Sequence, residues 1–406
     1  MVADYEQQAA RFASAFSILH KAIANRAFPA ASAAITHTGK LMALKAFGHF
    51  VYEDDVAAEV EGGVLLLADV AGDKNPEVST STLFDLASLT KPIATTTMAM
   101  ILYERGLLEL DAPVIGIVPE FLSDADPRRR DVTFRTLLAH SSGLPAYEKL
   151  FLKVHSRDEL LRAALETPLT AEPGTRAEYS DIGFIVLGVA LERLAEEPLA
   201  TYCQREIFGP LGMANTTFNP PAELRPQIPP TADERLVCEQ KSDIPRAAVP
   251  APHDASAPNK WSTFRNRIIQ GEVQDENAFV LGGVAGHAGL FSTVEDVARF
   301  AQCMLQGGTP ILRPETVSLF TSRESTPAGS SRTLGWDTPT PPSQSGKYFG
   351  PRSYGHLGYT GTSLWIDPER QLSVTLLTNR TWPDCSNQAI RQVRPTFHDA
   401  MIEAFS

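Results

Sequence analysis

The chain has 406 residues, of which 43% are hydrophobic and 21% charged, a composition typical of a globular protein and not of a disordered chain. A domain usually has roughly 100–200 residues, so this length predicts two lobes or one large mixed domain. The formal net charge of −12 repels phosphate backbones, so nucleic acid is not expected as a partner.

The first residues, Met1 to Glu6, lack the basic start and the apolar run of a signal peptide. No stretch of the sequence approaches the ~20 apolar residues that are needed to cross a membrane. We therefore expect a cytoplasmic protein without a membrane partner. A signal removed from the sequence would leave the same pattern, and the protein would then be periplasmic or secreted.

The N-terminal part predicts a helix followed by a hairpin. Apolar side chains recur at helical spacing from Phe12 to Ile23 and predict an amphipathic helix over about residues 5–25. Residues 29–38 and 41–50 then have strand character on either side of a two-residue turn.

The middle of the chain is dominated by helical patterns. Residues 92–105 and 180–196 carry long apolar patterns of this kind. A further helix is expected over residues 294–305, with Thr293 or Ser292 as its N-cap.

The C-terminal part resembles the N-terminal part in its pattern. Residues 363–366 and 372–377 are strand-like on either side of a turn, and residues 391–405 predict a closing helix.

Strands at both ends with helices between them predict an α/β (α+β) fold with a discontinuous lobe. Residues 1–80 and 290–406 are expected to form an α/β lobe, and residues 81–289 an inserted, mostly helical lobe. Within the latter, residues 219–258 contain nine prolines and few apolar runs, which predicts an irregular loop. Such a loop is either a functional lid or a disordered segment.

The tetrad Ser88-Leu89-Thr90-Lys91 is the only Ser-x-x-Lys in the sequence. On its own it is far more typical of an N-cap serine followed by a solvated lysine than of a catalytic pair. The helix that follows is strongly apolar, however, and buried lysines are rare unless they are paired or functional. Residues i and i+3 share a helix face, so Lys91 can reach the hydroxyl of Ser88 and activate it as a nucleophile. The helix N-terminus adds N–H donors that suit a developing oxyanion.

Six segments of the chain form an ordered series of different motifs. They are Phe84 to Lys91, Thr136 to Pro145, Pro173 to Phe184, Phe208 to Met213, Gly286 to Thr293 and His356 to Gly361. In this order they resemble the motifs of class C β-lactamases, penicillin-binding D-alanyl-D-alanine carboxypeptidases and the related carboxylesterases. The resemblance covers residues 28–379 and includes the Ser-x-x-Lys tetrad.

This resemblance implies a β-lactamase-like fold, with an antiparallel sheet flanked by helices, and it implies roles for particular residues. Tyr179 is expected to act as general base and acid, with Lys91 lowering its pKa from the usual value of ~10. The implied substrate-binding residues are Asp181, His356, Gly358 and Tyr359.

Two positions depart from the family pattern. The second motif usually reads Tyr-x-Asn, but here Asp181 takes the place of the asparagine. An ionised carboxylate cannot donate a hydrogen bond, and it favours a charged Lys91. The third motif often begins with lysine, but here it begins with His356, which is mostly neutral at pH 7 and would gain charge towards pH 6. Both departures favour neutral esters or an unusual peptide over β-lactams.

Other histidines carry similar sequence letters. His37 and His287 each begin a His-x-Gly triplet, but neither lies where the third motif belongs, so both are interpreted as structural. His140, in the segment between the first and second motifs, is expected to order a loop.

No metal or cofactor is expected. The four cysteines match neither a zinc site nor a redox pair. The sequence also has no His-Glu-x-x-His, no phosphate-binding Gly-rich loop and no Gly-x-Ser-x-Gly elbow.

The leading hypothesis is a serine hydrolase that acts through an acyl-enzyme and is carboxylesterase-like on small esters. The alternatives are a D-amino-acid peptidase or DD-carboxypeptidase, or a weak β-lactamase. A different class is a penicillin-binding sensor that is acylated without turnover. The expected partner is a small ester, β-lactam or peptide substrate, and the sequence does not determine the oligomeric state.

Overall fold

Strands from both ends of the chain form one six-stranded sheet in the computed structural model, which describes residues 1–53, 55, 75–235 and 264–405. The order across the sheet is β1-β3-β2-β11-β10-β9, and all neighbours are antiparallel except β1 and β3. The strands are β1 (Val2–Ala3), β2 (Ala30–His37), β3 (Lys40–Gly48), β9 (Tyr354–Leu357), β10 (Ser363–Asp367) and β11 (Leu372–Thr378). The two predicted strand pairs are therefore confirmed, and they meet where β2 pairs with β11.

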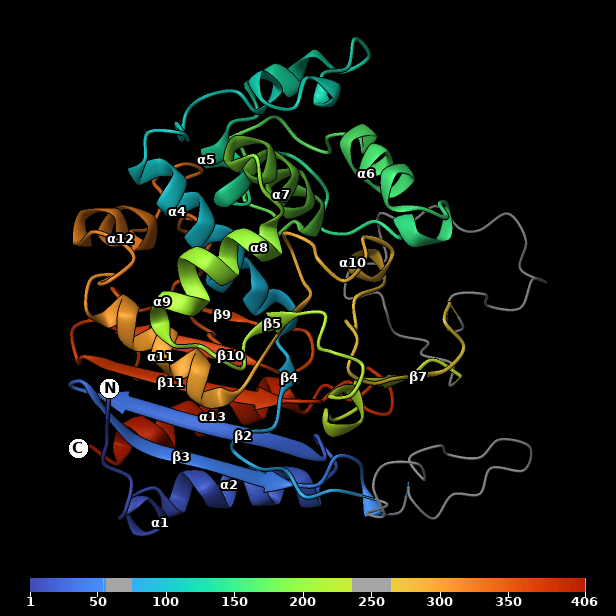
Figure 1. Ribbon diagram of the computed structural model, residues 1–406. Coiled ribbons are helices and arrows are strands. Elements are labelled where there is room, and N and C mark those ends of the chain that lie inside the picture. Colours follow the sequence, from blue (N-terminus) through green and yellow to red (C-terminus); the bar gives the residue numbers. More distant parts are fainter. Residues whose placement is uncertain (54, 56–74, 236–263, 406) are drawn as a thin grey trace.

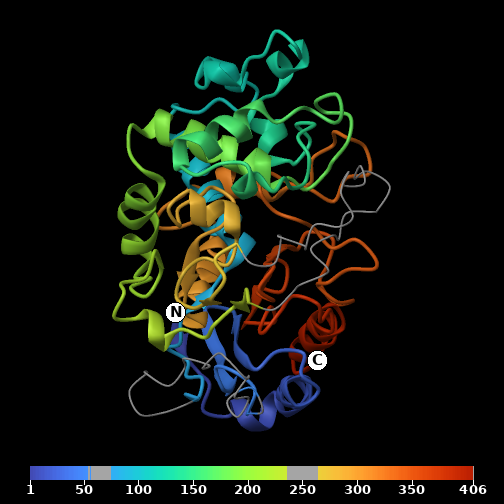
Figure 2. The same ribbon diagram turned by 90° about the vertical axis from the view of Figure 1, so that its right-hand side faces the viewer.

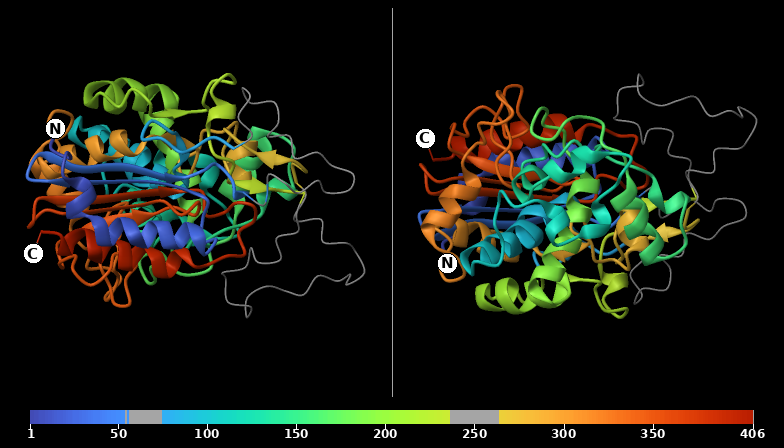
Figure 3. Two further views of the ribbon diagram at one scale, coloured as in Figure 1. Left: turned by 90° about the horizontal axis from the view of Figure 1, so that it is seen from below. Right: turned by 90° about the horizontal axis from the view of Figure 1, so that it is seen from above.

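Helices cover both faces of this sheet (Figures 1 and 3). One face carries α1 (Gln8–Arg11), α2 (Ala13–Ala24) and α13 (Ile390–Glu403), and the other carries α11 (Val294–Leu305). Because both faces are covered, β2 and β11 are buried along almost their whole length, including their serine and threonine side chains.

The N-terminal helix is interrupted, although one continuous helix was predicted. Phe12 has φ −104° and ψ 22°, which separates α1 from α2. Phe12 and the apolar side chains of α2 still face the sheet, with Phe12, Phe16 and Leu19 buried, whereas α1 has no buried residue.

The remaining helices lie on the α11 side of the sheet (Figures 1 and 2). They are α4 (Thr97–Glu104), α5 (Phe134–Leu138), α6 (Arg157–Glu166), α7 (Asp181–Ala195), α8 (Leu199–Cys203), α9 (Gly209–Leu211), α10 (Glu276–Val280) and α12 (Pro314–Thr321). The described residues also form two small sheets. The first is β4 (Phe84–Asp85), β8 (Leu290–Ser292) and β5 (Thr217–Phe218), and the second is β6 (Ala232–Asp233) and β7 (Ile268–Ile269).

Side-chain caps fix the starts of two predicted helices. The hydroxyl of Ser180 accepts a hydrogen bond from the backbone N–H of Gly183 at the start of α7. Thr293, one of the two predicted caps, accepts one from Asp296 at the start of α11.

The helix after Ser88 does not begin as an α-helix. A 3-10 turn over Ala87–Leu89 leads into a π-helical turn over Lys91–Thr96, and regular α4 follows. Pro92 has no N–H to donate, and the hydroxyl of Thr97 donates to the carbonyl of Pro92 at 2.9 Å. Widened turns of this kind occur often at functional sites.

The largest apolar core runs without a break from the sheet into the helices above it. The predicted division of the chain near residues 80 and 290 therefore stays a prediction. Of the predicted loop, residues 236–258 lie outside the described residues, and residues 219–235 contain a 3-10 turn and β6. None of the described helices combines the length and the apolar composition that crossing a bilayer requires.

Candidate active site

The turn that presents Ser88 is fixed by the side chain of Asp85. Its carboxylate accepts hydrogen bonds from the backbone N–H of Ala87 at 2.8 Å and of Gln274 at 2.7 Å. Ala87 has φ +47°, a left-handed conformation that is unfavourable for residues with a Cβ. Burial raises the pKa of Asp85 to about 6. Asp85 thus stabilises a strained backbone immediately before Ser88.

The same turn is attached to the segment that follows β9. The hydroxyls of Thr360 and Thr362 donate to the carbonyls of Asp85 and Leu86 at 2.8 and 2.9 Å. Gly358 packs directly beneath this contact, where a Cβ would lie 1.9 Å from the Thr362 Oγ1 and 2.6 Å from the Leu86 oxygen. The nucleophile motif and the third motif therefore form one packed unit.

Gly358→Ala is expected to displace this unit and to lower kcat by a factor on the order of 10², the usual cost of moving a reacting group by ~1 Å. Gly116→Ala is a matched control, because a Cβ there meets no atom within 4 Å. Ester hydrolysis and thermal unfolding of both variants test the prediction. Unchanged kcat in a folded Gly358→Ala enzyme would contradict it.

The hydroxyl of Ser88 lies between two polar side chains. The Nζ of Lys91 donates to the Ser88 Oγ at 3.0 Å, and the hydroxyl of Tyr179 donates to it at 2.7 Å. Tyr179 is 91 residues away in the sequence, immediately before the residue that caps α7. The three residues predicted from the motifs are thus brought together.

Lys91 is completely buried and has an acceptor for each of its three N–H groups. Besides Ser88, it donates to the Asp181 Oδ1 at 2.6 Å and to the carbonyl of His287 at 3.0 Å. Burial lowers the pKa of Lys91, but the contacts with Asp181 and Tyr179 raise it by more, so the net direction is upward. The resting site therefore holds Lys91 as an ammonium ion.

Tyr179 is held in its phenol form. Burial raises its pKa, and the opposing effect of Lys91 is smaller, so the net direction is upward. The influence of Lys91 has the predicted sign, but burial outweighs it. Tyr179 therefore keeps its proton in the resting site and donates it towards Ser88.

His356 lies on β9 beside Tyr179, with the two ring centroids 5.9 Å apart. Its Nδ1 is 2.9 Å from the carbonyl of Leu357, and the side chain is buried. Burial lowers the pKa of His356 well below its usual value, and Lys91 and Arg332 act in the same direction. The imidazole is therefore neutral at pH 7, and the predicted gain of charge towards pH 6 is wrong.

A pocket of about 550 Å³ opens in front of Ser88. The candidate residues Tyr179, Asp181, His356, Gly358 and Tyr359 all line it, and Lys91 lies behind them. The wall also contains charged residues that sequence reasoning did not single out: Asp275, Glu276, Arg332, Asp337, Arg380, Arg391 and Arg394. Their spacing in the sequence carries no signal, because the pocket assembles them from distant segments.

The other histidines are distributed as follows. His37 packs against Phe405 with its ring tilted by 49° and 4.5 Å between the ring centroids, and it does not line the pocket. His287 lies at the site after all, because its carbonyl accepts from Lys91 and its Nε2 lies 2.8 Å from the Asp275 Oδ1. The His-x-Gly letters of His287 were therefore a usable signal, although for a residue beside the nucleophile rather than for the third motif.

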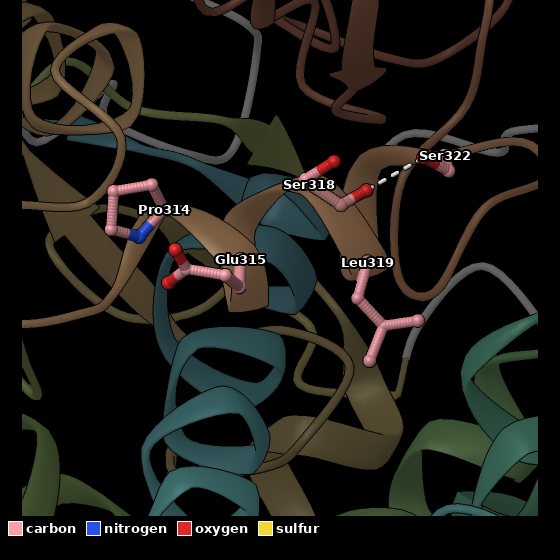
Figure 4. Close-up of a pocket in the computed structure, with 5 residues that line it drawn as sticks. All are labelled: Pro314, Glu315, Ser318, Leu319 and Ser322. Carbon is pink, nitrogen blue, oxygen red and sulfur yellow. Dashed lines mark hydrogen bonds between the residues drawn. The ribbon is translucent and has the colours of Figure 1, made fainter.

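A second pocket of about 550 Å³ lies along α12 and is shown in Figure 4. Its lining residues are Pro314, Glu315, Ser318, Leu319 and Ser322. The hydroxyl of Ser322 donates a hydrogen bond to the carbonyl of Ser318 at 2.6 Å, at the C-terminal end of α12. This pocket contains no basic group beside a hydroxyl and offers no comparable chemistry.

The chain belongs to the Beta-lactamase family, whose family model matches residues 15–394. It is a serine hydrolase of that family, and its fold is β-lactamase-like.

Two curated relatives resemble the chain over most of its length. A protein of Escherichia coli K12 named "Putative D-alanyl-D-alanine carboxypeptidase" is 32% identical over 378 residues, which is 87% of this chain and 79% of the relative. A protein of Bacillus subtilis named "N-acetylmuramyl-L-alanine amidase" is 31% identical over 374 residues, covering 87% of this chain and 77% of the relative.

Solved structures share the fold at low sequence identity. The hydrolase EstCE1, described as having promiscuous acyltransferase activity, superposes with a TM-score of 0.71 at 23% identity and covers 97% of this chain and 99% of its own. A class C β-lactamase from Rhodobacter sphaeroides superposes with a TM-score of 0.64 at 21% identity, covering 97% and 99%.

Proposed function

We propose that this enzyme is a carboxylesterase-like serine hydrolase that forms an acyl-enzyme on Ser88, with Lys91 and Tyr179 as proton-transfer partners. The observation that carries the proposal is the position of the Ser88 Oγ, which faces the pocket and accepts hydrogen bonds from both partners. A nucleophile within hydrogen-bond reach of its acid–base groups is the arrangement that covalent catalysis requires.

Acylation on this geometry moves one proton from Ser88 to the leaving group. The Ser88 Oγ attacks the ester carbonyl carbon, and the new C–O bond forms as the alcohol C–O bond breaks. Tyr179 starts as a phenol, so it gives its proton to the departing alkoxide and takes the proton of Ser88, which avoids a free phenolate. Lys91, as an ammonium ion, stabilises the negative charge that develops during this exchange.

Deacylation repeats the exchange with water in place of the alcohol. Water attacks the acyl carbon, Tyr179 accepts a proton from the water, and Tyr179 returns a proton to the Ser88 Oγ as the acyl group leaves. The products are a carboxylic acid and the resting enzyme, so the proton count closes.

The preference for neutral esters over β-lactams rests on two residues. The Asp181 Oδ1 accepts a hydrogen bond from Lys91, and the carboxylate has no N–H that could donate to a substrate carbonyl. His356 is neutral and attracts a substrate carboxylate only weakly. We therefore expect hydrolysis of short p-nitrophenyl esters to exceed hydrolysis of nitrocefin by a wide margin at pH 7.

A second candidate activity is hydrolysis of a carboxylate-terminated peptide. Arg332 favours it, because its guanidinium lines the pocket and lies 5.4 Å from the ring centroid of Tyr179. The names of the two curated relatives point to peptide substrates in the same way. A panel of short p-nitrophenyl esters, nitrocefin and D-Ala-D-Ala peptides, assayed with wild type and Ser88→Ala, separates the candidates. Peptide turnover above ester turnover would overturn the leading proposal in favour of the second.

The double variant Asp181→Asn with His356→Lys is expected to shift the preference towards nitrocefin by about 1–3 kcal/mol, as one or two charge-assisted hydrogen bonds would. The quantity to measure is the ratio of kcat/KM for nitrocefin to that for p-nitrophenyl acetate. In wild type this ratio should stay constant between pH 7 and pH 6, because the depressed pKa of His356 keeps it neutral. A double variant with an unchanged ratio would refute the assignment of specificity to these residues.

A further inference from the structure

His140 holds the backbone on both sides of Tyr179. It follows α5 with φ +54°, and its carbonyl accepts a hydrogen bond from the N–H of Glu178 at 2.8 Å. Its side-chain Nδ1 accepts a second one from the N–H of Ser180 at 3.0 Å. The two residues that flank Tyr179 are therefore attached to one histidine.

The ring of His140 also packs against the ring of Tyr179. Their centroids are 4.6 Å apart with 36° between the planes, and Phe184 lies against the same imidazole at 4.9 Å. His356 contacts Tyr179 as well, at 5.9 Å. The two hydrogen bonds to the flanking backbone and the ring contact together limit the directions in which the Tyr179 hydroxyl can point.

His140 is suited to hold Tyr179 rather than to react. It is buried, and it is not among the residues that line the pocket, so it does not face the substrate. Burial lowers the pKa of His140 well below its usual value, and Arg332, Lys91 and His356 add to this effect. A neutral ring with a free Nδ1 lone pair is the form that can accept the Ser180 N–H.

We propose that His140 is a positioning residue that sets the hydroxyl of Tyr179 against Ser88 through its Nδ1 contact with Ser180. The inference rests on the proposed role of Tyr179 in proton transfer. A displacement of ~1 Å in a reacting group can lower a rate by a factor on the order of 10². The contact therefore affects the chemical step and leaves substrate binding largely unchanged.

The test is a double-mutant cycle on ester hydrolysis by the full chain. His140→Phe keeps an aromatic ring but removes the acceptor, and it is expected to lower kcat by at least ~10-fold with little change in KM. His140→Asn keeps an acceptor in the place of Nδ1 and should lower kcat less than His140→Phe does. In the Tyr179→Phe background, His140→Phe should change kcat by no more than about 2-fold, because the group that it positions is gone.

The control separates positioning from general stability. His398 is another buried histidine, 3.1 Å from the Ser363 Oγ and 3.1 Å from the carbonyl of Gln344. His398→Phe should lower the midpoint of thermal unfolding and leave kcat of the folded enzyme unchanged.

Two results would overturn the inference alone: wild-type kcat in folded His140→Phe, or an equal loss from His140→Phe with and without the Tyr179 hydroxyl. If His140→Phe does not fold, His140→Asn takes its place. An equal loss of kcat from His140→Asn in the wild-type and Tyr179→Phe backgrounds would also overturn the inference. Full activity in Tyr179→Phe would instead remove the proposed role of Tyr179 itself.

Discussion

Replacement of Ser88 by alanine is expected to abolish both ester hydrolysis and covalent labelling of the enzyme. Ser88 supplies the hydroxyl that receives the acyl group, so the loss in kcat/KM should be on the order of 10⁴ or more. A fluorophosphonate probe followed by peptide mass spectrometry should find the adduct on Ser88 in wild type and no adduct in the variant.

Ser353→Ala is the matched control for this prediction. Ser353 is fully buried, and its hydroxyl has no hydrogen-bond partner among the described residues, so the same atom is removed without touching the pocket. The Ser353→Ala enzyme should be labelled on Ser88 and should hydrolyse esters at the wild-type rate. An adduct on a different serine, or residual turnover in Ser88→Ala that approaches the wild-type rate, would show that the nucleophile has been assigned wrongly.

The sequence alone was sufficient to predict the contact between Ser88 and Lys91, which are close together in the chain. Ser88 and Lys91 are three residues apart, so a helical turn brings them together, and the apolar residues that follow predict that Lys91 is buried. Both expectations agree with the 3.0 Å contact and with the complete burial of Lys91. The widened turn over Lys91–Thr96 was not predicted, because no residue pattern distinguishes a π-helical turn from an α-helical one.

Contacts across long stretches of chain could not be derived from spacing. Tyr179 and Asp181 lie 91 and 90 residues from their partners, and only the resemblance to known motifs placed them at the site. The Asp85 contact with Gln274 spans 189 residues and involves a backbone N–H, which has no sequence signature. An aspartate within the apolar run Phe84 to Ala87 was the one available sign that Asp85 is buried.

The fold was easier to predict than the pKa values of the site. Hydrophobic patterns fix strands and helices locally, and the strand pairs β2–β3 and β10–β11 agree with them. Whether Tyr179 or Lys91 carries a proton depends instead on the balance between burial and charge at one point in space. For Tyr179 burial prevails over the attraction of Lys91, and for Lys91 the partners Asp181 and Tyr179 prevail over burial. Neither balance is visible before the side chains are placed.

Removal of either proton-transfer partner is expected to lower kcat by a factor of at least ~10², the usual contribution of a positioned acid–base group. Tyr179→Phe keeps the ring contacts and loses only the hydroxyl that lies 2.7 Å from Ser88, so the fold should survive. Lys91→Met removes the charge but leaves Asp181 without its cation, which should also lower the stability.

The double variant Lys91→Met with Asp181→Asn separates these two effects. It removes both charges of the pair and should recover the thermal stability without recovering kcat, because the developing negative charge still lacks its ammonium ion. Burst kinetics with p-nitrophenyl acetate, measured alongside thermal unfolding, would show whether acylation or deacylation is slowed. Near-wild-type kcat in Tyr179→Phe would reduce Tyr179 to a packing residue. Recovery of activity together with stability in the double variant would show that Lys91 acts only by holding the fold.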